Sequence, residues 1–141
     1  MAIKMRVLYA SSKKKINNIA NEIKAKYELA FNSVDVIPPA YPCDKERIVV
    51  LAISAKGDLS DAVERFCKEL TKARAQNVAL MIDGDQIAAD KLKTILTEAG
   101  TNVIDEVHFV NGGFPIFGTN VKPEEKTATF DWIDRVIAGL K

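Results

Sequence analysis

The chain is poor in the side chains that build metal or redox sites on their own. Its 141 residues include only two cysteines, one histidine and one tryptophan. Two cysteines provide neither a disulfide framework nor a cysteine-rich metal site. The formal net charge is only +1, which gives no general attraction to nucleic acid or to an anionic membrane surface. We therefore expect no nucleic-acid partner.

Long apolar runs are absent as well. No stretch approaches the ~20 residues of a membrane span, and residues 1–6 lack the apolar core of a secretory signal peptide. We expect a cytoplasmic protein with no membrane partner. Hydrophobic residues make up 48% of the chain and charged residues 28%, as in ordinary globular proteins. The length predicts a single domain over residues 1–141.

Short apolar runs and helical periodicities alternate along the chain. Runs typical of strands occupy residues 6–10, 34–38, 47–53, 77–82 and 102–110. Those at 6–10, 47–53 and 77–82 are continuously apolar at their centres, as in parallel strands that are buried on both faces. The alternation predicts an α/β fold with one open, mostly parallel sheet and helices on both faces.

Four helices are expected between and after these runs. Their apolar stripes run from Ile16 to Phe31, from Ala62 to Leu70 and from Ala88 to Ala99, and the last helix begins near Pro123. For that last helix, the stripe predicts a buried face made of Phe130, Ile133, Ile137 and Leu140. The connection from the second strand to the third, residues 38–44, contains three prolines and no helical pattern.

Ligands of such sheets bind at the carboxyl ends of the strands, where the strand order reverses. This selects the loops at residues 11–15, 54–59 and 83–86. None contains a Gly-x-Gly-x-x-Gly or a Walker motif. Cys43 precedes the third strand, Cys67 lies on an apolar helix face and His108 stands between Val107 and Phe109, so we expect them to be packed rather than catalytic. No catalytic constellation of side chains emerges, which leaves enzymatic activity open.

Three consecutive lysines, Lys13 to Lys15, stand where the first helix begins. A helix N-terminus carries a partial positive charge, so cations are unfavourable there unless an anion offsets them. The pattern therefore favours a bound phosphate, a nucleotide or an acidic partner, and it does not distinguish among them.

The order of these segments resembles the flavodoxin-like family. Residues 9–20 align without a gap to the family's phosphate loop, Tyr-Gly-Ser-Thr-Thr-Gly-Asn-Thr, and to the helix that follows it. Residues 53–61, 66–81 and 106–113 are similar to the family's third-strand loop, its following helix and fourth strand, and the end of its fifth strand. The resemblance implies a flavodoxin-like open five-stranded parallel sheet, in the order 2-1-3-4-5, with FMN as cofactor.

The same resemblance implies where FMN would lie. It assigns the phosphate to Ser11, Ser12, Lys13, Lys14, Lys15 and Ile16. It assigns the flavin ring to the loops that contain Ser54, Ala55, Lys56, Gly57, Asp83 and Gly84. Tyr41, Phe114 or Phe117 would replace the family's usual aromatic wall, because residues 54–59 contain no aromatic side chain. Lys14 and Ile16 also depart from the family's Gly and Thr.

Two functions follow. The first is an FMN-binding electron-transfer protein, or the flavin-binding partner of a redox enzyme, which would meet a redox partner protein. The alternative is a flavin-free module of the same fold that acts in protein binding or assembly. It would use the exposed sheet edge and the loop at residues 111–118. The oligomeric state is left open.

Overall fold

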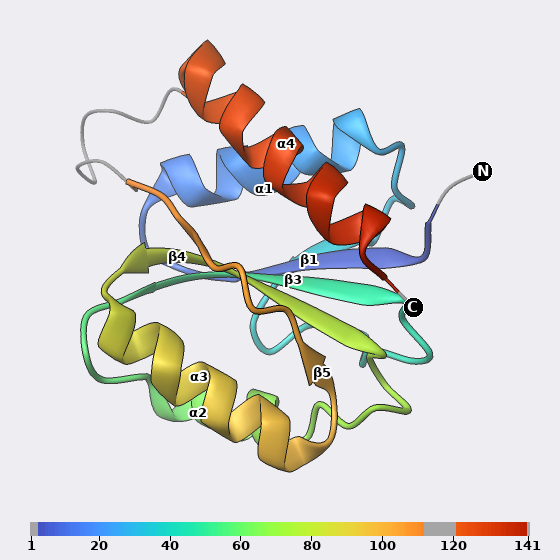
Figure 1. The fold of residues 1–141 in the computed structure, drawn as a ribbon, viewed down its shortest axis with the longest axis vertical. Helices are drawn as coiled ribbons and strands as arrows, with labels where there is room; N and C mark the ends of the chain where they lie inside the picture. Colours follow the sequence, from blue (N-terminus) through green and yellow to red (C-terminus); the bar gives the residue numbers. More distant parts are fainter. Residues whose placement is uncertain (1–2, 112–120, 141) are drawn as a thin grey trace.

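In a computed structural model that describes residues 3–111 and 121–140, a parallel sheet forms the centre of the molecule (Figure 1). Its strand order is β2-β1-β3-β4-β5, and β6 also pairs with β4. The strands are β1 (Met5–Ala10), β2 (Val34–Val36), β3 (Ile48–Ala55), β4 (Asn77–Gly84), β5 (Asn102–Val103) and β6 (His108–Phe109). The predicted parallel order 2-1-3-4-5 is confirmed, with the fifth position shared by two short strands.

Two helices cover each face of the sheet (Figure 1). They are α1 (Lys14–Lys26) and α4 (Pro123–Ala138) on one face, and α2 (Asp61–Lys68) and α3 (Gln86–Ala99) on the other. Alternate residues of β3 therefore enter two different cores. Leu51 packs with α2 and α3, whereas Val50 and Ala52 pack with α1 and α4. This two-sided burial explains why the runs in β3 and β4 are continuously apolar.

Local signals fix several helix ends. Ser60 and Asp85 are the N-caps of α2 and α3, and their side chains accept hydrogen bonds from the N–H groups of Val63 and Ala88. α3 ends, as predicted, at Gly100, whose φ of 109° lies in the left-handed region. α4 starts at Pro123, also as predicted. The N-cap of α1 differs, since Lys13 forms no side-chain cap.

The predicted strand at residues 102–110 is wrong in its middle. Residues 104–107 leave the strand because side chains of α4 form hydrogen bonds with this segment. The indole Nε1–H of Trp132 donates to the carbonyl oxygen of Glu106 at 2.9 Å, and Arg135 binds the Glu106 carboxylate at 2.6 Å. Trp132 is fully buried, so its N–H must find an acceptor, and that acceptor lies in the segment between β5 and β6.

Two helical predictions also need correction. α1 ends at Lys26 because Glu28 adopts a left-handed φ of 52°, and Phe31 is 92% exposed rather than part of the apolar stripe. The buried face of α4 consists of Thr129, Trp132, Ile133 and Val136. Phe130, Ile137 and Leu140, predicted as that face together with Ile133, are only partly buried. Among the helices described, none has both the length and the apolarity needed to cross a membrane.

Gly84 offers a test of how tightly β3 and β4 pack at their carboxyl ends. A Cβ added there would overlap the backbone carbonyl oxygen of Ala55, its strand partner. We expect Gly84→Ala to lower the free energy of unfolding by roughly 1–3 kcal/mol, as overpacking does, measured by urea denaturation.

Gly139→Ala is the matched control for Gly84→Ala. An added Cβ at Gly139 makes only ordinary contacts, 3.6 Å or more from the nearest atoms. This control is expected to be neutral or slightly stabilising. Equal effects of the two substitutions would contradict the close approach of β3 and β4.

Candidate functional site

The loops that follow β1, β3 and β4 meet at one edge of the sheet, as predicted. Parallel pairing sets Ala10 beside Ile53, and Ser54 beside Asp83. Ser11, one residue past the end of β1, therefore lies near the ends of β3 and β4. This is the edge at which α/β sheets of this kind bind ligands.

Hydroxyl groups and one carboxylate form a continuous hydrogen-bond chain across this edge. The Oγ atoms of Ser11 and Ser54 are 2.6 Å apart, and the Ser54 hydroxyl donates to Asp83 Oδ2 at 2.8 Å. A serine hydroxyl has one hydrogen to donate, so the Ser11 hydroxyl donates to Ser54. Ser11 Oγ in turn accepts the backbone N–H of Lys13 at 3.0 Å.

Lys13 closes this chain into a ring. Its Nζ lies 2.8 Å from Asp83 Oδ2, and the Asp83 side chain is only 9% exposed. Ser11, Lys13, Ser54 and Asp83 are called the four-residue ring below. The ring joins the carboxyl ends of β3 and β4 to the loop after β1, and it uses both serine hydroxyls as well as the Lys13 N–H. The structure thus supplies the charge that balances Lys13 from within the protein.

Lys15 is neutralised in the same way, by α4. It is a buried lysine whose Nζ lies 2.7 Å from Glu125 Oε2, and Glu125 also accepts the Lys122 N–H at 3.0 Å. Burial alone would raise the pKa of Glu125. The hydrogen bonds from Lys15 and Lys122, together with their positive charges, outweigh burial and hold this pKa below its usual value. Two of the three lysines therefore have carboxylate partners in the same chain.

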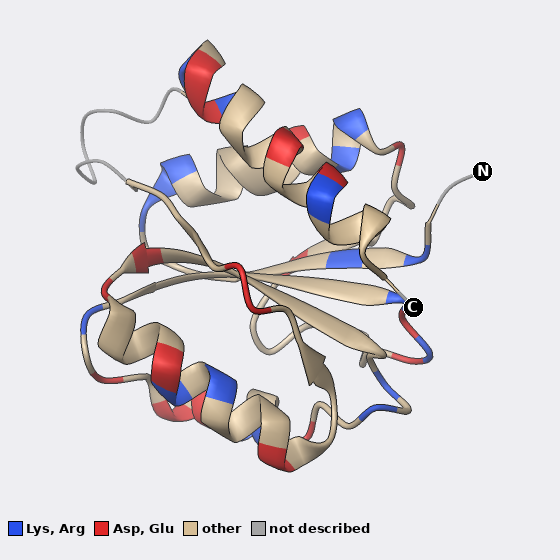
Figure 2. Cartoon of the chain, in the orientation of Figure 1, with Lys and Arg blue, Asp and Glu red and all other residues tan. Residues whose placement is uncertain are grey.

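The remaining residues predicted for the site divide into three groups. Ser12, Lys14 and Lys56 are exposed beside the ring. Ile16 points away from it into the core beneath α1 and α4. Ala55 and Gly84 face each other across β3 and β4, and the Gly57 N–H donates to the Asp85 carboxylate at 3.0 Å. In Figure 2 the basic start of α1 and the acidic end of β4 lie at the same edge.

Two contributors, Asp85 and Glu125, are not among the residues assigned to the predicted site, although Asp85 lies in the predicted loop at residues 83–86. Asp85 binds the N–H groups of both Ala88 and Gly57, and these two bonds lower the pKa of its carboxyl group. The signal for Asp85 was an aspartate directly before a predicted helix. For Glu125 it was an acidic residue in the first turn of the last helix. Sequence reasoning used the second signal only for the helix dipole.

These described residues do not fit the phosphate of FMN. The Ser11 hydroxyl and the Lys13 N–H already bond within the four-residue ring, and Ile16 offers a buried methyl surface where a hydroxyl would be needed. The Asp83 carboxylate would repel a phosphate dianion at this edge. What remains for an anion is the exposed Ser12 together with the start of α1, which has no side-chain cap and no acidic residue in its first turn.

Three aromatic residues were predicted to contact the flavin ring, and the structure describes only one of them. Tyr41 is wrong as a wall, because its carbonyl oxygen binds Arg6 near the start of β1, away from the carboxyl edge. Phe114 and Phe117 lie outside the described residues, as does most of the loop at residues 111–118.

The residues expected to be packed are packed. His108 stacks on Trp132 with ring centroids 5.1 Å apart, and its Nε2 lies 3.1 Å from Thr129 Oγ1. Burial lowers the pKa of His108 below its usual value. Cys43 and Cys67 are buried free thiols, and burial raises the pKa of Cys67 to about 12. Within residues 3–111 and 121–140, no cluster of His, Cys, Asp or Glu is suited to a metal ion.

The Lys15–Glu125 pair predicts a pH-dependent stability. Because the pKa of Glu125 is lower in the folded protein than in the unfolded chain, its contribution is present above the unfolded pKa and is lost as the pH falls through the folded pKa. Glu125→Gln should cost roughly 1–3 kcal/mol at neutral pH, since it strands a buried lysine, and less in acid. Glu124→Gln, an exposed neighbour in the same helical turn, is the control. Equal losses for both variants in urea denaturation would contradict this assignment.

Comparisons with known proteins add one finding about the fold. No family model matches the chain, and neither does any curated protein. Among solved structures, the chain is similar to the "Structure of a Short-Chain Flavodoxin Associated with a Non-Canonical PDU Bacterial Microcompartment", with a TM-score of 0.69 and 13% sequence identity over 100% of both chains. At this identity the similarity concerns the fold. The fold of this chain is that of a short-chain flavodoxin.

Proposed function

We propose that this protein is a flavodoxin-fold module that works without FMN and acts by binding another protein. The observation that carries the proposal is the four-residue ring, which occupies the polar groups at the edge where a flavin phosphate would have to bind. A binding edge whose donors already have partners inside the protein has few left for a ligand.

The free-energy cost of opening the four-residue ring supports a protein that works without FMN. To free the ring for a phosphate, Asp83 must give up its bonds from Lys13 and Ser54. Hydrogen bonds to charged groups contribute roughly 1.5–3 kcal/mol each. An affinity falls tenfold for about every 1.4 kcal/mol. Opening the ring would therefore weaken FMN binding by a factor on the order of a hundred or more, before the repulsion from Asp83 is counted.

Exposed apolar side chains near β2 support a protein partner. Phe31 is 92% exposed, Tyr41 63% and Val36 45%, and all three lie in β2 or within five residues of it. A partner would contact these side chains rather than extend the sheet. The Asp35 carboxylate already accepts the N–H groups of Val36 and Ala40, at 2.8 and 2.9 Å, and so blocks donors along this edge.

The second candidate is an FMN-binding electron-transfer protein with a redox partner. It is favoured by the likeness to a short-chain flavodoxin and by the start of α1, which lacks a side-chain cap. FMN would supply the electron chemistry, and the protein would position it. For this candidate the four-residue ring would have to open on binding.

A flavin titration separates the two candidates. We expect the purified protein to be colourless and to leave FMN fluorescence unchanged at ~100 μM protein, which excludes binding stronger than about −5.5 kcal/mol. A yellow protein, or quenching with a micromolar dissociation constant, would overturn the flavin-free proposal and establish the second candidate.

Asp83→Asn tests whether the ring itself keeps FMN out. The substitution removes the negative charge and frees Lys13. We expect weak FMN quenching to appear in this variant. Asp58→Asn is the control, because Asp58 pairs with Lys91 at an exposed position, and it should leave FMN unbound. If neither variant gains affinity, the ring is not the barrier.

Phe31→Ser tests the partner surface. Phe31 is almost fully exposed, so the free energy of unfolding should change by no more than ~0.5 kcal/mol. Proteins that copurify with the chain from its native cells and bind it directly when purified should lose that binding. Ile87→Ser, at a 59% exposed position on α3, is the control and should retain them. Unchanged binding by Phe31→Ser would exclude this surface.

A further inference from the structure

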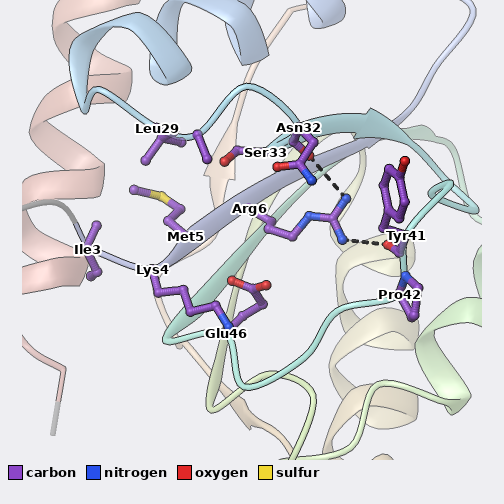
Figure 3. A pocket seen from close by; sticks show the side chains of 11 residues that line it. Ile3, Lys4, Met5, Arg6, Leu29, Asn32, Ser33, Tyr41, Pro42 and Glu46 are labelled. Atoms are coloured by element: carbon purple, nitrogen blue, oxygen red, sulfur yellow. Dashed lines mark hydrogen bonds between the residues drawn. The ribbon is translucent and has the colours of Figure 1, made fainter.

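A cavity of about 330 Å³ lies at the opposite edge of the sheet, where the strands begin (Figure 3). Met5 and Arg6 line it from the start of β1, and Ser33 and Glu46 line it from the residues that precede β2 and β3. The four-residue ring belongs to the carboxyl ends of β1, β3 and β4. The cavity is therefore separate from the site described above.

The cavity has a simple cause in the chain's connections. A crossover between parallel strands normally contains a helix that covers the sheet. Residues 37–47, between β2 and β3, contain no helix. An irregular segment that includes Tyr41 and Pro42 lies beside the start of β1 instead, and the cavity lies between this segment and Arg6.

Arg6 is a buried cation with hydrogen-bonding capacity to spare. It is 6% exposed, and none of the ion pairs among the described residues includes it. Its Nη1 donates to the Tyr41 carbonyl at 2.7 Å, and Nη2 donates to the Asn32 carbonyl at a long 3.4 Å. The guanidinium has five N–H donors, and its Nε–H has no acceptor among the described residues. A carboxylate is the partner that such a fork prefers.

Ser33 and Glu46 are buried in the same cavity, with 5% and 6% of their surface exposed. The described structure gives the Ser33 hydroxyl no hydrogen bond. The positive charges of Lys4 and Arg6 attract the Glu46 carboxylate, and the backbone N–H of Asp44 donates to it, but no cation of the described residues lies within 4.0 Å of it. A buried carboxylate of this kind is stabilised by a cationic donor. Figure 3 shows both Arg6 and Glu46 among the side chains that line the cavity.

This spare capacity is confined to the cavity. The other buried polar residues of the described chain have partners. Thr101 donates to the Ala75 carbonyl at 2.7 Å, Asn77 to the Arg47 carbonyl at 3.0 Å, and Lys15 pairs with Glu125. Buried polar groups are nearly always satisfied in native proteins. Among the described residues no enclosed side-chain nitrogen or oxygen lacks a hydrogen-bond partner. The unused polar groups of Arg6, Ser33 and Glu46 are therefore those that reach the open space of the cavity, where a ligand can bind them.

The remaining walls and the volume restrict the ligand's size and character. Ile3, Met5, Leu29 and Pro42 give the cavity an aliphatic lining. Ligand pockets commonly measure about 300–1,000 Å³, so this cavity suits only a small molecule.

We propose that this cavity binds a small zwitterion of the α-amino acid class with an aliphatic side chain. Its carboxylate binds Arg6 and Ser33, its ammonium binds Glu46, and its side chain lies against Leu29 and Met5. The ligand thereby adds a direct partner of opposite sign to each charge, beyond the attraction that Lys4 and Arg6 already exert on Glu46. The cavity lies at the opposite edge of the sheet from the proposed flavin site. The proposal of an amino-acid ligand is therefore independent of whether FMN binds.

The test is a titration of the ¹⁵N-labelled full chain with L-leucine, followed by amide NMR shifts. We expect saturable shifts at residues 3–6, 29–33 and 41–46, with a dissociation constant of about 1 mM or tighter. Isocaproate lacks the amine of leucine, and isoamylamine lacks its carboxylate. Each should bind at least tenfold more weakly.

Glu46→Gln tests the ammonium contact with little change of shape, and Arg6→Lys tests the fork while keeping the charge. Both should weaken leucine binding at least tenfold, and a thermal melt checks that each variant folds. Glu98→Gln, an exposed glutamate on α3, is the control and should bind leucine like the parent protein.

Two results would overturn the proposal. One is the absence of saturable shifts at these residues with leucine, isoleucine, valine and methionine, each at ~10 mM. The other is equal binding of isocaproate and leucine with no effect of Glu46→Gln, which would make the ligand a simple carboxylate rather than a zwitterion. In the second result the Glu46→Gln variant still binds leucine through Arg6. This retained binding shows that the variant is folded.

Discussion

The contact between Lys13 and Asp83 determines the character of the carboxyl edge. It brings the end of β4 and the start of α1 together through a 2.8 Å ion pair, and the two serine hydroxyls complete the link to β1 and β3. Since Asp83 is only 9% exposed at its side chain, its charge needs a partner of opposite sign. Lys13 is that partner, and a mobile anion is not required to stabilise the lysine.

A second lysine–carboxylate ion pair, between Lys15 and Glu125, joins α1 to α4. Lys15 reaches from α1 to Glu125 at the start of α4, and Tyr27 reaches from the other end of α1 to Asp134 at 2.7 Å. The two helices that cover one face of the sheet are thus joined at both ends by polar contacts, with Ile16 and Trp132 packed in the core beneath them. Moving Lys15 from Glu125 to a flavin phosphate would therefore disturb the helix packing as well as the loop.

The two edges of the sheet differ in how completely their polar groups are satisfied. At the carboxyl edge, side chains from neighbouring loops bind one another. At the amino edge, Arg6, Ser33 and Glu46 surround a cavity and retain free capacity. The difference arises from the connection between β2 and β3, which covers the sheet without a helix.

The sequence by itself determined the elements whose signals are local. Continuous apolar runs predicted β3 and β4, Gly100 predicted the end of α3, and Pro123 predicted the start of α4. The triple lysine predicted an anion at the start of α1, in the form of a bound phosphate, a nucleotide or an acidic partner, whereas in the structure two of the lysines pair with carboxylates of the same chain. This source of negative charge could not be predicted, because Asp83 and Glu125 are far from these lysines along the chain and become neighbours only when the sheet and α4 are in place.

Tertiary structure alone decided the remaining features, since each depends on a partner distant in sequence. The break between β5 and β6 exists because the buried Trp132 needs the Glu106 carbonyl, 26 residues away. The burial of Arg6 depends on Tyr41 and Asn32, which belong to segments on either side of β2. Periodicity reports which face of an element is apolar. It does not report which polar group a folded chain will set opposite a buried charge.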